Sequence, residues 1–181
     1  CAKIATSPGA VEEEEFDEEE FDKLQEEESD EMLGGKINLA ISDCGDAATH
    51  GHVSGISPTF VTKGKKSVVT GTGHLDTTVT DGSFDFDIKF GDMSVHKCTG
   101  DICGPSKCSF PMGTGSIVYH GLNCPIAEGD VTMDFDVRVS RIVPKEFETL
   151  TIELQSKGSA GNLLCAKIAT SPGAMDEEIS V

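Results

Sequence analysis

Polar and apolar residues alternate one by one along several stretches of the chain, which is the period of a β-strand with one buried face. In residues 83–90 the apolar positions are Phe84, Phe86, Ile88 and Phe90, and charged residues stand between them. In residues 131–139 the apolar positions are Val131, Met133, Phe135, Val137 and Val139. Each stretch is therefore predicted to be a strand with one face in the core and the other in solvent.

Further strands are expected wherever β-branched and apolar residues recur between clusters of Gly, Pro, Asp or Ser. These stretches are 36–42, 52–61, 66–73, 74–80, 115–120, 149–156 and 162–170. Gly71 and Gly73 are interpreted as marking a bulge or turn. Helical spacing is confined to an acidic stretch near the N-terminus, so the pattern predicts an all-β protein built as a two-sheet sandwich.

The charge of the chain is large and unevenly distributed. The sequence has 32 Asp and Glu against 14 Lys and Arg, a net charge of -18, which argues against nucleic acid as a partner and is the wrong sign for binding anionic membrane surfaces. Residues 11–32 hold 14 of the acidic residues and a single lysine. Such a block repels itself, so residues 11–33 are predicted to be a disordered linker, either a solvating spacer or a loose site for cations or a basic partner.

A ten-residue sequence, CAKIATSPGA, occurs twice, at residues 1–10 and again at residues 165–174. Acidic residues follow both copies, so the separation of 164 residues is interpreted as the period of a tandem array. Residues 1–10 then end a preceding unit, 34–172 form one complete domain, and 173–181 begin another acidic linker or tail. The alternative, a bacterial lipoprotein lipidated at Cys1, leaves the repeat unexplained.

The chain has seven cysteines, and six of them fall in the complete unit. An even number favours disulfides, and disulfides favour a secreted or endolysosomal location. The alternative is a zinc site formed by Cys98, Cys103, Cys108 and Cys124. The spacing of these four cysteines lacks the tight C-x-x-C knuckle of structural zinc sites.

The sequence contains few other patterns that point to chemistry. His50 and His52 have the spacing of two metal ligands on one strand face, yet no third ligand is evident. Nucleophile elbows, phosphate-binding loops and zinc-protease motifs are absent from the sequence. Four carboxylates alternate regularly with apolar residues and are interpreted as the solvent face of strands, namely Asp85, Asp87, Asp134 and Asp136. We therefore expect neither an enzyme nor a bound cofactor or metal.

Three short motifs, ISDCG at 41–45, NCPIAEG at 123–129 and LLCAKIATS at 163–171, together resemble the ML family of lipid-recognition domains. The pattern is closest to the group of the ganglioside activator and the Niemann-Pick type C sterol carrier. The cysteine-rich stretch 97–111 is more similar to the activator branch. Residues 56–64 lack the additional cysteine pair of the sterol carriers, so a sterol is the less favoured ligand.

The resemblance implies an immunoglobulin-like β-sandwich with an internal apolar cavity and no catalytic groups. It also implies that Cys44 pairs with Cys165, while Cys98 with Cys103 and Cys108 with Cys124 hold loops at the cavity mouth. Four residues, Met93, Val95, Pro125 and Ile126, are expected near the entrance. The lining is expected to come from Phe84, Phe86, Ile88, Phe90, Met133, Phe135, Val137 and Val139.

The function expected on this basis is lipid binding or lipid transfer by one unit of a tandem array. The ligand is an acyl-chain lipid, either a glycolipid, a phospholipid or a sterol, and a membrane surface, a lipid-processing enzyme and neighbouring copies of the domain are the expected partners. The basic loop with Lys63, Lys65 and Lys66 is interpreted as a solvated turn, and the alternative is a contact to a lipid head group or an anionic bilayer. The alternative function is a structural or recognition sandwich whose interior is an ordinary solid core.

Overall fold

A computed structural model describes residues 34–173 and confirms the all-β prediction. The residues form eleven strands and two short 3₁₀ helices, η1 at Pro111–Gly113 and η2 at Lys145–Glu148. The strands are β1 Lys36–Asp43, β2 Gly51–Ser57, β3 Phe60–Thr62, β4 Lys66–Leu75, β5 Ser83–Phe90, β6 Met93–Asp101, β7 Ser106–Ser109, β8 Gly115–Tyr119, β9 Gly129–Val139, β10 Thr151–Gly158 and β11 Gly161–Pro172.

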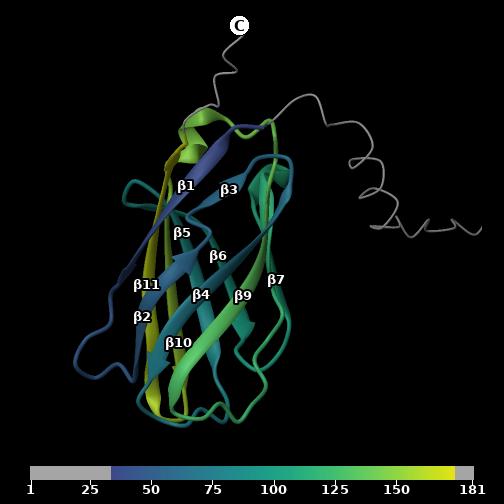
Figure 1. Ribbon diagram of the computed structural model, residues 1–181. Coiled ribbons are helices and arrows are strands. Elements are labelled where there is room, and N and C mark those ends of the chain that lie inside the picture. The colour runs from purple at the N-terminus through teal and green to yellow at the C-terminus, as the bar shows by residue number, and fades with distance from the viewer. Residues whose placement is uncertain (1–33, 174–181) are drawn as a thin grey trace, which may run out of the picture. The chain divides into compact units, whose positions relative to one another are not determined.

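The strands make two antiparallel sheets that pack face to face, as expected for a β-sandwich (Figure 1). The six-stranded sheet has the order β3-β1-β11-β10-β5-β6, and the five-stranded sheet has the order β2-β4-β9-β8-β7. At each edge of the sandwich the edge strands of the two sheets are consecutive in the chain, β2 and β3 at one edge and β6 and β7 at the other. The last strand, β11, pairs with the first, β1, over Ile37 to Asp43.

Three strand predictions differ from the structure. The stretch 52–61 is two strands in different sheets, because Pro58 lacks the N–H that a continuous ladder requires. The stretches 66–73 and 74–80 are largely one strand, β4, which ends at Leu75 and continues through Gly71 and Gly73 without a turn. The irregularity lies in the partner strand β2, whose pairing with β4 shifts between Val53 and Gly55, opposite Gly73 and Thr72. Strands β6 and β7 were not predicted, because apolar and polar residues do not alternate there.

The core between the sheets consists of two clusters of buried apolar side chains. The larger cluster includes Phe84, Phe86 and Ile88 of β5, as the alternation predicts, together with residues from other strands and loops. The smaller cluster lies where β1 begins and β9 ends. Its buried members are Ile37, Val61, Val69 and Val143, and Val137 and Val139 pack against them.

All six cysteines of residues 34–173 form disulfides, but two of the three expected pairings are wrong. Cys44 is bonded to Cys165, as the family resemblance implies. The other bonds are Cys98–Cys108 and Cys103–Cys124.

The expected bond from Cys98 to Cys103 fails because the backbone between these residues is mostly extended along β6. A strand rises about 3.3 Å per residue, so it carries the two Cα atoms beyond the about 7 Å that a disulfide spans. The Cys98–Cys108 bond instead joins edge strand β6 of one sheet to edge strand β7 of the other. It closes that edge of the sandwich.

Candidate lipid-binding cavities

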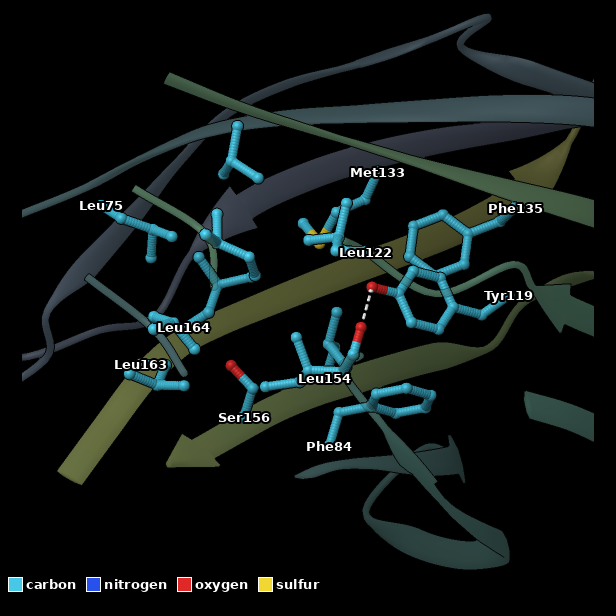
Figure 2. A pocket seen from close by; sticks show the side chains of 14 residues that line it. Leu75, Phe84, Tyr119, Leu122, Met133, Phe135, Leu154, Ser156, Leu163 and Leu164 are labelled. Atoms are coloured by element: carbon cyan, nitrogen blue, oxygen red, sulfur yellow. Dashed lines mark hydrogen bonds between the residues drawn. The ribbon is translucent and has the colours of Figure 1, made fainter. Parts of the chain in front are cut away.

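Two cavities lie between the sheets, and their walls are almost wholly apolar. Cavity 1 has a volume of about 50 Å³ and lies toward the end of the sandwich where β4 ends and β9 begins. Figure 2 shows its lining, which is Leu75, Val79, Phe84, Ile102, Tyr119, Leu122, Ile126, Val131, Met133, Phe135, Leu154, Ser156, Leu163 and Leu164.

Cavity 2 has a volume of about 80 Å³ and lies in the middle of the sandwich. Gly71 of β4 is part of its wall, and a Cβ atom built on this glycine would meet nothing closer than 3.9 Å. The other lining residues are Leu39, Ile41, Val53, Ile56, Val69, Thr72, Phe86, Ile117, Met133, Phe135, Ile152, Leu154, Leu164, Ala166 and Ile168.

Four side chains line both cavities and form the partition between them. Met133 and Phe135 come from β9 in one sheet, and Leu154 of β10 and Leu164 of β11 come from the other. Phe135 stacks on Tyr119 with ring centroids 5.3 Å apart. Met133 is unbranched and adapts its shape readily, so the partition contains one side chain that can move with little cost.

Tyr119 brings the main polar group of cavity 1. Its hydroxyl donates a hydrogen bond of 2.8 Å to the backbone carbonyl of Ile102, as the dashed line in Figure 2 shows. Burial, with a further contribution from the negative charge of Asp101, raises the pKa of the Tyr119 phenol to about 12. The group is therefore neutral at physiological pH, and the cavity presents no charge to a ligand.

The structure places five of the predicted lipid-binding residues in the cavity walls. These are Phe84, Phe86, Ile126, Met133 and Phe135. Ile88 is buried in the larger core cluster without lining a cavity, and Val137 and Val139 pack on the smaller cluster.

The remaining four predicted residues, Phe90, Met93, Val95 and Pro125, are exposed. Met93 and Val95 begin strand β6, whereas Pro125 and Ile126 belong to the loop between β8 and β9 at the other end of the sandwich. The residues expected around one cavity entrance therefore lie at opposite ends of the sandwich and do not form a single rim. These residues are Met93, Val95, Pro125 and Ile126.

Most residues of the cavity walls are not among the predicted lipid-binding residues, although several of the strands that supply them are predicted. Leu164 lies within the predicted strand 162–170, beside the equally buried Leu163. Leu154 lies within the predicted strand 149–156 and alternates with exposed or half-buried residues. That alternation was the available signal. Val79 lies in the predicted strand 74–80, although the structure places it in a loop after β4. No such signal exists for Ile102 and Leu122, which also reach cavity 1 from loops.

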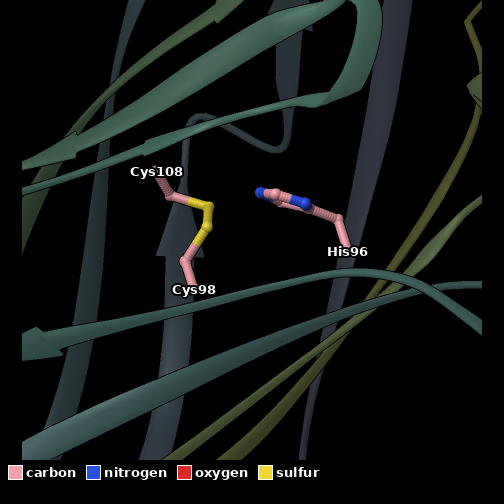
Figure 3. A group of neighbouring side chains, drawn as sticks. All are labelled: His96, Cys98 and Cys108. Atoms are coloured by element: carbon pink, nitrogen blue, oxygen red, sulfur yellow. A yellow bond between two sulfur atoms is a disulfide. The ribbon is translucent and has the colours of Figure 1, made fainter.

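One group of side chains in residues 34–173 has the spacing of metal ligands: His96, Cys98 and Cys108. Figure 3 shows the ring of His96 directed toward the Cys98–Cys108 disulfide. Disulfide sulfurs are not thiolates, so this group has no soft anionic ligand. The four cysteines of the zinc alternative are bonded in the same way.

The two histidines considered as metal ligands have separate partners. His50 Nδ1 lies 2.9 Å from a carboxylate oxygen of Asp76, and His50 Nε2 lies 3.1 Å from the carbonyl oxygen of Ala160. His52 Nδ1 lies 3.3 Å from a carboxylate oxygen of Asp43. Both rings are therefore held by carboxylates that fasten the start of β2.

The carboxylates of strand β9 make cross-strand contacts on the solvent face, as the alternation predicts. Asp134 accepts a hydrogen bond of 2.7 Å from the hydroxyl of Thr70, and Asp136 accepts one of 3.0 Å from Lys66. Burial alone would raise the pKa of Asp136, but the hydrogen bond and charge of Lys66, aided by His120, lower it overall.

Among the residues described, none of the helices reaches the length and apolarity of a membrane span.

The described residues thus define a β-sandwich fastened by three disulfides, with uncharged apolar cavities between its sheets. Residues 38–171 match the family model described as the ML domain, and the chain belongs to this family. No curated protein matches the chain. Among solved structures, chicken MD-1 complexed with lipid IVa is similar, with 14% sequence identity and a TM-score of 0.40. The similarity covers 76% of this chain and 82% of that one.

Proposed function

We propose that this chain binds an acyl-chain lipid between its two sheets and transfers it, with no catalytic step of its own. The observation that carries the proposal is the interior of the sandwich, where two apolar cavities are separated only by Met133, Phe135, Leu154 and Leu164. Membership of the ML family, a family of lipid-recognition domains, supports the same function.

The physical requirement for a lipid carrier is a large apolar surface that replaces the membrane around the acyl chain. Each buried methylene is worth about 0.8 kcal/mol, so a chain of about 16 carbons gains on the order of 10 kcal/mol by leaving water. A carrier has to offer a comparable gain. The walls of the two cavities have the composition that this gain requires, because their side chains are almost all aliphatic or aromatic.

The cavities are too small for an acyl chain as they stand. Each is smaller than the about 150 Å³ cavity that holds one benzene molecule. We propose that the lipid displaces the partition, joins the two cavities and moves the sheets apart. Met133 is the side chain best suited to yield, and the three disulfides keep the sandwich intact while the sheets separate.

Native mass spectrometry of the full chain after incubation with mixed lipid vesicles tests this proposal. We expect a stoichiometric adduct whose organic extract yields an acyl lipid. The same small cavities favour a second candidate function, a solid sandwich that serves as a structural or recognition repeat. A chain that stays without adduct at every lipid composition would support that second function and contradict the first.

Three further features belong to the proposal. The repeated sequence at residues 1–10 and 165–174 supports a tandem array, in which neighbouring copies are joined by acidic segments. Residues 1–33 and 174–181 lie outside the described residues, so the domain boundaries stay a prediction. The three disulfides indicate an extracellular or lumenal protein, and the secretory or endolysosomal compartments and a membrane or lipid-processing partner follow as proposals.

A further inference from the structure

Two side chains in the wall of cavity 1 carry a hydroxyl group, Tyr119 and Ser156. The Tyr119 hydroxyl donates its hydrogen bond to the carbonyl of Ile102. The Ser156 hydroxyl forms no hydrogen bond within residues 34–173, although Ser156 is only 7% exposed. Figure 2 shows its oxygen directed into the space that the lining side chains surround. The Ser156 hydroxyl is therefore a buried polar group that faces the cavity without a partner.

The position of Ser156 in the sheet is one that apolar residues normally occupy. Alternation along β10 puts Ser156 on the same inward face as Ile152 and Leu154. In the neighbouring strands it lies opposite Phe84 of β5 and Leu164 of β11, and both of these side chains are buried. A buried hydroxyl without a partner is unfavourable, because it gives up its hydrogen bonds to water. An unpaired group of this kind requires an explanation.

The ladder between β10 and β11 is irregular at the same residue. Ser156 pairs with Leu164, whereas Lys157 pairs with Asn162, so Leu163 is an extra residue in β11. Leu163 and Leu164 are consecutive, yet both are buried and both line cavity 1. β-Bulges are frequent beside functional sites, where they redirect a side chain. The bulge and the unpaired hydroxyl thus lie in the same part of the wall.

The remaining wall limits which group of a ligand can meet this hydroxyl. Among residues 34–173, no Lys, Arg, His, Asp or Glu lines cavity 1. A phosphate or carboxylate would lose its hydration in the cavity without meeting a cation, which is costly. A neutral hydroxyl group would find both a donor and an acceptor in Ser156. The polar atom that fits is therefore an uncharged one on the hydrocarbon part of a lipid.

A bound water molecule is the competing partner for Ser156. A water needs about 10–15 Å³, and cavity 1 has a volume of about 50 Å³. Water and a lipid hydroxyl predict different selectivity. A water would serve every lipid alike, whereas direct contact with the lipid distinguishes a hydroxylated chain from a plain one.

We propose that Ser156 determines ligand specificity by binding a hydroxyl group on the hydrocarbon skeleton of the lipid. The ligand class is a lipid with a hydroxylated skeleton, whether an acyl chain or a sterol. This inference rests on the proposed function, because cavity 1 is one part of the proposed lipid site, and it adds selection among lipids. A site with a buried hydrogen-bonding group discriminates against ligands that leave that group unpaired.

Competition between matched lipids, measured by native mass spectrometry of the full chain, tests the proposal. Vesicles contain equal amounts of distearoyl phosphatidylcholine and a phosphatidylcholine with one hydroxyl group on a stearoyl chain. Three such lipids are compared, hydroxylated near the carboxyl end, at mid-chain or near the methyl end. We expect one of them to be bound about tenfold more than the plain lipid, the factor that one hydrogen bond is worth. A parallel incubation compares cholesterol with cholestene, which lacks the hydroxyl, and distinguishes the two sources of the group.

Three variants assign the selectivity to the hydroxyl of Ser156. Ser156→Ala is expected to bring the preference to within about twofold. Ser156→Thr retains the hydroxyl and is expected to retain the preference, as is the matched control Ser83→Ala, which changes an exposed serine of β5. Urea denaturation should show Ser156→Ala to be at least as stable as the wild-type chain, because the variant removes an unpaired buried group.

The outcomes separate this inference from the proposed function. Equal uptake of hydroxylated and plain lipids, for the acyl chains and for the sterols, would overturn the role of Ser156 while lipid binding stands. A preference that persists in Ser156→Ala would also overturn it, because another group would then bind the hydroxyl. A chain that takes up no lipid at all would contradict the proposed function itself, and this inference with it.

Discussion

Filling cavity 2 from Gly71 tests whether the interior of the sandwich is the lipid site. Gly71→Val places three carbon atoms in the cavity, and the first of them, the Cβ atom, would lie 3.9 Å from Met133 O and from Phe135 Cε2. The backbone of Gly71 lies in the middle of strand β4, where valine is a favourable residue. We expect this variant to be more stable than the wild-type chain and to bind less lipid.

The gain in stability follows from two separate routes. Three buried carbon groups at about 0.8 kcal/mol each, less about 0.5 kcal/mol of side-chain entropy, give about 2 kcal/mol. A cavity of about 80 Å³, at about 24 cal/mol per Å³, gives about 2 kcal/mol when it is filled. Urea denaturation measures this difference in the free energy of unfolding.

Lipid uptake by the same variant is measured by native mass spectrometry after incubation with vesicles. Gly55→Val is the matched control, because Gly55 lies in edge strand β2 outside both cavities and its added Cβ would meet only Thr72 Oγ1, at 3.5 Å. We expect full uptake in the control and strongly reduced uptake in Gly71→Val. A Gly71→Val chain that is more stable and still carries the full lipid complement would refute the assignment of the lipid to cavity 2.

Three further predictions concern the forces that hold the sandwich. The absorbance of Tyr119, the single tyrosine of the chain, is expected to titrate near pH 12 in the folded protein. The unfolded chain releases this proton near pH 10, so the free energy of unfolding falls between these values; a midpoint near 10 would show that the ring is exposed. Asp136→Asn is expected to lower the free energy of unfolding by up to about 1 kcal/mol at neutral pH, because the Lys66 contact is lost. The wild-type advantage disappears as the pH falls through the lowered pKa of Asp136, and an advantage that persists in acid would exclude this cause. Cys44→Ala/Cys165→Ala opens a loop with a sequence separation of 121 and is expected to cost about 4–5 kcal/mol in thermal or urea unfolding, whereas a loss below about 1 kcal/mol would contradict the loop-entropy argument.

The sequence predicts the class of fold because two strands, β5 and β9, have an uninterrupted two-residue alternation. Phe84 and Phe86 are buried where that alternation places them. Phe90 continues the same pattern and is nevertheless 40% exposed, because it is the last residue of β5, beside the turn 91–92, where the sheet ends. Alternation predicts which face a residue occupies, but not how far the partner sheet extends over that face.

Local alternation does not predict the cavities or the disulfide pairing, because both depend on which distant segments of the chain meet. Val79 and Ile126 approach each other through an isolated β-bridge between two loops, and no local period predicts that these two residues meet. Cys103 pairs with Cys124 because the same loops converge at this end of the sandwich. These contacts follow from the tertiary arrangement, so the family resemblance alone placed only Cys44 and Cys165 correctly.

The most direct test of the central claim is a measurement at Tyr119. The chain has one tyrosine and no tryptophan, and Tyr119 lines cavity 1 and stacks on the partition residue Phe135. Vesicles that supply a phospholipid brominated on its acyl chain are expected to quench the tyrosine fluorescence, while the unbrominated lipid does not. Unchanged fluorescence in a chain that has bound one brominated lipid by mass would place the lipid outside the sandwich and contradict the account.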